Sequence, residues 1–89
     1  MFTWDEGKRQ TNIAKHGVDF MDADDFDFLN ASTEVDDRFD YGEVREVSIG
    51  FIGSRLHVLV FTRRSGNIHV ISLRKANDRE VKKYVQALK

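Results

Sequence analysis

Apolar residues recur along this chain first with a helical period and later with a period of two. Near the beginning, Thr3 and Glu6 have the spacing of a capping box, which predicts a helix that starts near Trp4. We expect this helix to end at His16 and Gly17, because glycine readily takes the left-handed conformation that closes helices. One helical face would carry the polar residues Lys8, Thr11, Asn12 and Lys15.

A shorter apolar pattern then predicts a second helix from about Asp19. Its apolar positions are Val18, Phe20, Ala23, Phe26, Phe28 and Leu29, and its polar side consists of Asp22, Asp24, Asp25 and Asp27. These aspartates resemble a cation-binding cluster only loosely, because they lack the spacing and closing glutamate of an EF-hand loop. We therefore interpret them as a solvated or partner-facing surface.

The pattern changes to strands from Thr33 onwards. Residues 34–40 predict a weak, polar edge strand, and the alternation of Val47, Ile49 and Phe51 with polar residues or glycine predicts a half-buried strand. Residues 56–61 are apolar on both faces except at His57, which is typical of a central strand. Residues 68–73 predict a last strand after a turn at residues 64–67.

The chain closes with a second amphipathic helix. Asn77 and Glu80 repeat the capping-box spacing, and the following apolar stripe is Val81, Tyr84, Val85 and Leu88. The predicted order is two helices, four strands and one helix. This order predicts an α+β fold with a four-stranded, mostly antiparallel sheet, in one domain that spans residues 1–89.

Size and composition narrow the class of protein. A chain of 89 residues has room for one domain, and the absence of cysteine excludes disulfides and thiolate catalysis. No apolar run approaches the length of a membrane span, and the acidic N-terminus has no signal-peptide pattern. We therefore expect a cytoplasmic protein that has no contact with the membrane.

The charges are divided unequally along the chain. The first 44 residues hold 12 acidic and 4 basic residues, a balance of −8, whereas the last 45 hold 3 acidic and 10 basic residues, a balance of +7. A region of one sign attracts partners of the opposite sign. The basic half is thus a candidate nucleic-acid surface, and the acidic half is a candidate for contact with a basic protein.

Arginines and lysines at strand ends and on the last helix are the candidates for phosphate contact. Arginine suits bidentate contact with phosphate, and binding by such a cluster would weaken with salt. The candidate RNA-binding residues are Arg45, Arg55, Arg63, Arg64, Arg79 and Lys82, and the candidate catalytic residues Arg74 and Lys75 follow the last strand. Each residue alone is more simply a solvated surface cation, but the cluster as a whole favours binding.

His16 is the titratable group best suited to proton transfer near neutral pH. Lys8 and Lys15 of the same helix would stabilise the negative charge of a phosphate in the transition state. An alternative interpretation of equal weight is that His16 is simply the last residue of the helix, where it interacts favourably with the helix dipole. His57 and His69 lie in strands and are more simply structural, and no spacing of His, Asp or Glu indicates a metal site.

Several short segments, spread over nearly the whole chain, carry a resemblance to a known family. They are Phe2 to Lys8 with Asn12, Lys15 to Val18 with Phe20, Tyr41 to Glu43 with Arg45, Ile49-Gly50, and Ile71 to Ala76 followed by Glu80 and Tyr84. Together these segments resemble the BrnT family of toxins. The resemblance implies a RelE-like ribonuclease fold and the toxin of a type II toxin–antitoxin pair. Such a toxin cuts RNA and blocks translation, and its partner is a BrnA-type antitoxin that brings the complex to DNA.

Metal-free RNA cleavage requires a base, a cation near the phosphate oxygens and an acid for the leaving oxygen. We hypothesise that Arg74 and Lys75, with Arg55 and Arg63, hold the phosphate, while His16 or a lysine of the first helix moves protons. No cofactor is expected. Two alternatives remain open: a module that binds nucleic acid without cutting it, and an interaction protein whose acidic helix docks on a basic partner.

Overall fold

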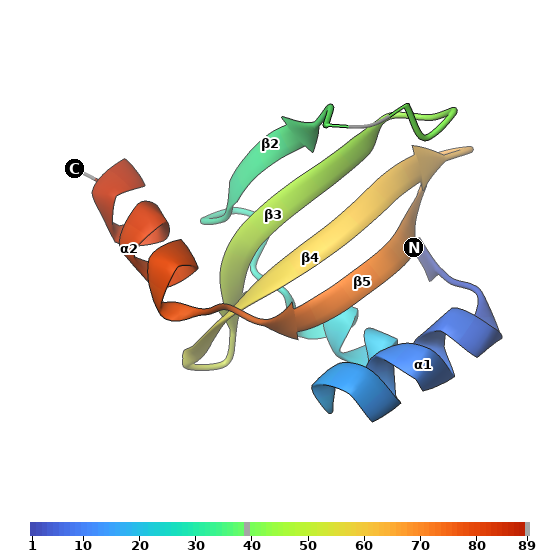
Figure 1. The fold of residues 1–89 in the computed structure, drawn as a ribbon, viewed down its shortest axis with the longest axis horizontal. Coiled ribbons are helices and arrows are strands. Elements are labelled where there is room, and N and C mark those ends of the chain that lie inside the picture. The colour runs from blue at the N-terminus through green and yellow to red at the C-terminus, as the bar shows by residue number, and fades with distance from the viewer. Residues whose placement is uncertain (39, 89) are drawn as a thin grey trace.

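A five-stranded sheet with helical elements around it forms the body of the protein (Figure 1). The structure is a computed structural model, and it describes residues 1–38 and 40–88. The elements are β1 (Phe2–Thr3), α1 (Glu6–His16), the 3₁₀ helix η1 (Phe20–Asp25), β2 (Ser32–Asp36), β3 (Arg45–Ile52), β4 (Arg55–Arg64), β5 (Asn67–Lys75) and α2 (Asp78–Ala87).

The strand order is β1-β5-β4-β3-β2, and all pairs are antiparallel except β1 with β5. The expectation of an α+β fold with a mostly antiparallel sheet is confirmed, but the expected count of four strands is wrong. The fifth strand is β1, whose Phe2 lies opposite Ile68. Two residues are too few to show a period, so the sequence pattern could not reveal this strand.

The first helix ends as predicted but begins differently. Gly17 closes α1 with φ 70°, and its N–H donates to the carbonyl oxygen of Ile13. The expected cap at Thr3 is wrong, because Asp5 is the N-cap and its carboxylate accepts from the N–H of Lys8. The hydroxyl of Thr3 instead lies 2.8 Å from Nδ1 of His69 and ties β1 to β5.

The predicted second helix is shorter than its apolar pattern. It is the 3₁₀ helix η1, which ends at Asp25, so Phe26 and Phe28 lie outside it. Phe26 pairs with Ile52 in an isolated bridge, and its ring meets that of Phe28 edge to face at 4.8 Å between centroids. Phe26 is therefore buried and Phe28 half-buried against the sheet, and the helical period that they appeared to continue was coincidental.

The four predicted strands are confirmed, but some of their boundaries differ from the predicted ones. The predicted edge strand is confirmed as β2, although it covers Ser32–Asp36 and not residues 34–40, which include a position outside the described residues. The predicted central strand is β4, which pairs on both sides, with β3 and β5.

The last helix begins as the sequence indicates. Asn77 and Glu80 form a reciprocal capping box at the start of α2. Of its predicted apolar stripe, Tyr84 is buried, whereas Val85 is 44% exposed and Leu88 is 68% exposed. The helix lies beside one end of the sheet (Figure 1), so that only part of its stripe meets the strands.

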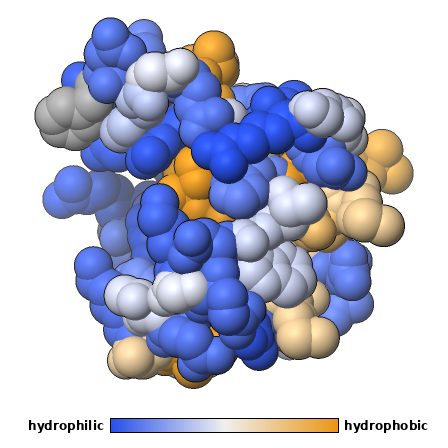
Figure 2. Space-filling model, turned by 90° about the vertical axis from the view of Figure 1, so that its right-hand side faces the viewer, coloured by the Kyte–Doolittle hydropathy of each residue, from blue (hydrophilic) through white to orange (hydrophobic). Residues whose placement is uncertain are grey.

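Two apolar clusters occupy opposite faces of the sheet. The cluster beside η1 includes the fully buried Phe20, Leu59, Phe61, Val70 and Leu73. The cluster beside α2 is built from Ile49, Leu56, Val58, Ala76 and Tyr84. On the side of the molecule shown in Figure 2, hydrophobic residues form only small areas among hydrophilic ones. Within the described residues, no helix is long and apolar enough to cross a membrane.

Candidate functional site

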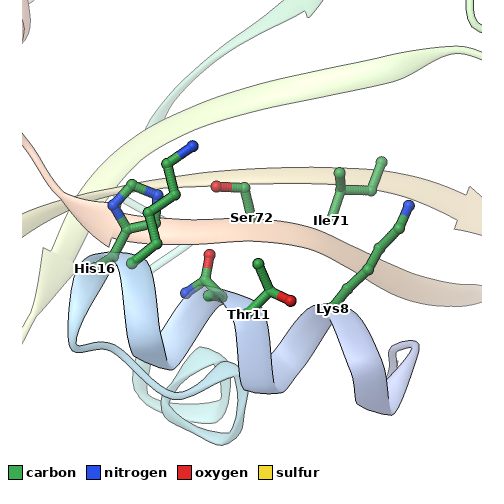
Figure 3. A pocket seen from close by; sticks show the side chains of 7 residues that line it. Lys8, Thr11, His16, Ile71 and Ser72 are labelled. Atoms are coloured by element: carbon green, nitrogen blue, oxygen red, sulfur yellow. The ribbon is translucent and has the colours of Figure 1, made fainter.

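A cleft of about 250 Å³ lies between α1 and β5 (Figure 3). Three of the predicted catalytic residues line it, namely Lys8, Lys15 and His16. The predicted polar face of Lys8, Thr11, Asn12 and Lys15 forms the helix side of the cleft, and His16 joins it eight residues after Lys8. In Figure 3, Lys8 and His16 stand at opposite ends of the cleft with Thr11 between them.

The strand side of the cleft is formed by Ile71 and Ser72. The pairing of β5 with β4 shifts here, because Val60 lies opposite Ser72 while Phe61 lies opposite Val70. Ile71 is thus the extra residue of a β-bulge. Bulges redirect side chains and are frequent beside active sites. A bulge leaves no simple sequence signal, so the role of Ser72 in lining the cleft was missed.

Asn12 fixes α1 against the strand. Its side-chain N–H₂ donates to the carbonyl oxygens of Leu73, at 2.7 Å, and Val18, at 2.9 Å, and its oxygen accepts from the N–H of Leu73 at 3.3 Å. On the side of β5 away from β4, the short β1 reaches only Ile68 and His69, and no other strand of the described residues pairs there. The buried amide of Asn12 therefore satisfies backbone groups of Leu73 that a strand on that side would otherwise bind.

Those bonds also set the direction of the helix relative to the strand. Asn12 meets Leu73, and the charges of Lys15 and Arg74 act on His16 at the end of α1. Burial and the charge of Arg64 lower the pKa of His69, and the charge of Lys8 at the start of the helix also contributes. The helix and β5 therefore run alongside each other in the same direction.

The surroundings of His16 favour its neutral form. Burial of the half-buried ring lowers its pKa below the usual value of 6.5, and the positive charges of Lys15 and Arg74 lower it further. A neutral imidazole is the form that can accept a proton.

Arg74 does not line this cleft. Its guanidinium forms two bonds of 2.7 Å with the carboxylate of Glu80 and lines a second cleft, of about 390 Å³, whose floor includes Val47, Val58 and Val60. This pairing raises the pKa of Arg74 and lowers that of Glu80. Arg74 therefore acts on His16 through its charge. Lys75, the last residue of β5, is exposed and lines neither cleft.

The predicted RNA-binding residues lie at two ends of the sheet. Arg55 and Arg63 are the first and ninth residues of β4, which separates them by roughly 26 Å at the usual rise of a strand. The hypothesis that both hold one phosphate together with Arg74 is therefore wrong.

Arg63 and Arg64 form ion pairs with carboxylates. Nε of Arg63 lies 2.8 Å from Oε2 of Glu46, and Nη2 of Arg64 lies 2.7 Å from Oε1 of Glu43. Arg45 lies 3.8 Å from the centre of the Tyr41 ring.

The other three predicted RNA-binding residues lie at the opposite end. Arg55 donates to the carbonyl oxygen of Ala76 at 3.2 Å, while Arg79 and Lys82 are exposed on α2. Within the described residues, no group of three or more His, Cys, Asp or Glu side chains is arranged to hold a metal ion.

Comparisons with known proteins point to one family. The family model described as "Ribonuclease toxin, BrnT, of type II toxin-antitoxin system" matches residues 4–80. The crystal structure of the ribonuclease toxin BrnT from Brucella abortus, at 1.1 Å resolution, is similar with a TM-score of 0.67. The two sequences are 37% identical, and the match covers 88% of this chain and 99% of that one. A search of curated proteins found no match.

Proposed function

The chain belongs to the BrnT family of ribonuclease toxins from type II toxin–antitoxin systems, and from this premise we propose that it is an endoribonuclease that cuts RNA and thereby inhibits translation. The observation that carries this proposal is the cleft that Lys8, Lys15 and His16 line. Two ammonium groups and an imidazole there match what phosphodiester cleavage requires.

The proposed reaction uses the RNA itself as nucleophile. The ribose 2′-oxygen attacks the adjacent phosphorus while the bond from phosphorus to the 5′-oxygen breaks, leaving a 2′,3′-cyclic phosphate and a 5′-hydroxyl. Neutral His16 takes the proton from the 2′-hydroxyl. Lys8 and Lys15 stabilise the charge on the phosphate oxygens, and either ammonium can protonate the departing 5′-oxygen. None of these steps uses a metal ion or cofactor.

Arg74 supports the reaction from outside the cleft. Burial and the charge of Lys15 lower the pKa of His16, and the charge of Arg74 adds to them. Its two bonds to Glu80 hold the guanidinium of Arg74 in place. It is therefore a positioning residue in this proposal, whereas His16, Lys8 and Lys15 would touch the substrate.

Cleavage of a defined RNA by the purified protein tests the proposal. Because general base catalysis contributes about 10²- to 10⁴-fold, His16→Ala should lose activity in that range. Lys8→Ala and Lys15→Ala should each lose about 10²-fold. Gln10→Ala is the matched control, since Gln10 is exposed on α1 and does not line the cleft. Activity should persist in EDTA.

Two outcomes would overturn this assignment. Full cleavage and full growth arrest by both His16→Ala and Arg74→Ala would place the site elsewhere. RNA binding without cleavage, on free RNA and on ribosomes alike, would instead identify a binding module.

We further propose that a BrnA-type antitoxin neutralises the protein and links it to DNA. Family membership in a type II system supports a protein antitoxin in general. Co-expression of the adjacent open reading frame should yield a stable complex and restore growth. Failure of that neighbour to bind would contradict the partner without affecting the proposed cleavage.

A further inference from the structure

Exposed cations at the two ends of the sheet differ in their partners. At the end where β4 finishes, Arg63 and Arg64 form ion pairs with Glu46 and Glu43. At the opposite end lie four exposed cations that form no ion pair with any described residue. These four, which we name the basic rim, are Arg55, Lys75, Arg79 and Lys82.

Backbone contacts bring the rim together from three elements. The N–H of Ala76 donates to the carbonyl oxygen of Leu56 at 3.0 Å, and Arg55 donates to the carbonyl oxygen of Ala76. The start of β4, the end of β5 and the approach to α2 therefore meet at one point. Lys75 directly precedes this point.

Arg79 and Lys82 extend the rim along the helix. They are three residues apart and so share one side of α2, opposite the buried Tyr84. Asp78, in the first turn, offsets one of the four positive charges, while Glu80 is already bound to Arg74. The rim thus keeps a net positive charge that no described carboxylate contacts.

The rim continues the cleft. Because α1 and β5 run in the same direction (Figure 1), and β1 just before α1 pairs with the start of β5, the His16 end of the cleft lies toward the end of β5, where Arg74 and then Lys75 follow. The Lys8 end lies toward His69 and the ion-paired Arg64. An anionic chain that leaves the cleft past His16 meets unpaired cations, whereas one that leaves past Lys8 meets cations already neutralised.

We propose that RNA bound with its cleaved phosphate in the cleft continues over the basic rim, so that the protein grips the strand mainly on the His16 side of the cut. This inference rests on the proposed function, since it assumes that the cleft holds RNA. Contacts between cations and phosphates make single-strand binding depend on salt, with a slope in log K against log salt of about 0.7 per phosphate contacted.

Binding of a fluorescent single-stranded RNA across a salt series tests the rim. All variants carry His16→Ala to prevent cutting. Replacing Arg79 and Lys82 by Gln should reduce the salt slope by about 1.4, which corresponds to two lost phosphate contacts. The matched control replaces Arg63 and Arg64 by Gln, which removes the same charge and should leave the slope nearly unchanged. Circular dichroism verifies that both pairs fold.

The outcomes separate the rim from the proposed function. Equal salt slopes for the Arg79/Lys82 variant and the Arg63/Arg64 variant would overturn the proposal that RNA binds the basic rim. Cleavage by the protein with His16 intact would then still support the proposed function. A reduced slope for the rim pair alone supports the rim. If the protein with His16 intact cuts no RNA, the proposed function fails while the rim remains an RNA-binding surface.

A second measurement tests the direction of the strand. RNAs that share one mapped cut site are lengthened on the 5′ side or on the 3′ side. The wild type should gain kcat/KM from extension on one side only. The Arg79→Gln, Lys82→Gln variant, made here with His16 intact, should lose that gain through a higher KM, because the phosphate contacts are equally strong in the bound RNA and in the transition state. Equal gains from both sides would overturn the one-sided grip.

Discussion

The two α-helices are similar in length, yet they are attached to the sheet by different forces. The 11-residue α1 buries a polar residue, Asn12, which bonds to the backbone of β5. The 10-residue α2 buries Tyr84 and lies beside one end of the sheet, where Val85 and Leu88 remain exposed. Hydrogen bonds from a buried amide therefore position α1, whereas apolar packing of Tyr84 and Val81, the hydroxyl bond of Tyr84 and ion pairs hold α2.

This difference matters because the candidate base and both candidate ammonium groups belong to α1. Burial of apolar area is not directional, so it tolerates small shifts of a helix. The amide of Asn12 accepts and donates at fixed positions on Leu73 and thus defines where Lys8 and His16 lie along β5. A site that needs groups within hydrogen-bond reach of a phosphate benefits from such a fixed helix.

The largest effect on stability is expected from Asn12→Ala. The substitution leaves the N–H and carbonyl of Leu73 without partners in a buried environment, which should lower the free energy of unfolding by about 3 kcal/mol. Urea denaturation measures this change. Gln10→Ala on the exposed side of α1 is the control and should stay within about 0.5 kcal/mol of the wild type. Equal losses for the two variants would show that Asn12 does not clamp the helix.

A smaller and more local effect is expected from Tyr84→Ala. This variant removes the ring that meets Phe51 edge to face at 5.8 Å and the hydroxyl that donates to Asn30 at 2.8 Å. We expect a loss of about 2–3 kcal/mol, confined to α2. Hydrogen exchange should show lost protection in α2 with β4 still protected. Tyr84→Phe should lose about 1 kcal/mol, because only the hydrogen bond disappears.

Glu80→Gln should destabilise the start of α2 by about 1–2 kcal/mol, because it weakens both the cap and the bond to Arg74. The pKa of Glu80 is lowered in the folded protein, chiefly by Arg74. Its contribution is therefore complete above its unfolded value of 4.5 and is lost as the pH falls through the lower folded value. Thermal melts should show the wild type and the variant converging in acid, and a gap that does not change with pH would contradict the ion pair.

The smallest expected effect is a displaced titration of His16. Its pKa is below 6.5 because of burial and the charges of Lys15 and Arg74, so cleavage should rise with pH through that lowered pKa. Lys15→Gln removes one positive charge and should move the pKa of His16 upward, together with the acid limb of the rate profile. NMR titration of the histidine ring protons measures it directly. An unchanged pKa in the variant would show that Lys15 does not act on the ring.

The ends of the elements illustrate what could be predicted from sequence. Gly17 and the Asn77–Glu80 pair mark helix ends because a left-handed conformation and a reciprocal cap need particular side chains. Thr3 met the same spacing rule and was misassigned, because Asp5 offers a better cap and Thr3 bonds to His69, which lies 66 residues away. Local rules fail where a distant residue competes for the same group.

Folding pairs some of the acidic residues of the first half with basic residues of the second half. Two ion pairs join the acidic first half to the basic second half, namely Glu34 with Lys83 and Glu43 with Arg64. A third, Glu46 with Arg63, forms within the second half. Folding thus neutralises part of the contrast and leaves Arg55, Lys75, Arg79 and Lys82 without ion pairs within the described residues. Charge counts alone could not distinguish a paired arginine from an unpaired one.

Local sequence patterns were enough to predict α1, α2, the four longer strands, and the shared helical face of Lys8 and Lys15, because these follow from periodicities within a single segment. Tertiary structure alone decided that β1 pairs with β5, that Asn12 clamps Leu73, and that Arg74 turns toward Glu80 and away from the cleft. Those outcomes depend on which distant groups compete for the same partner, and only the folded chain brings such groups together.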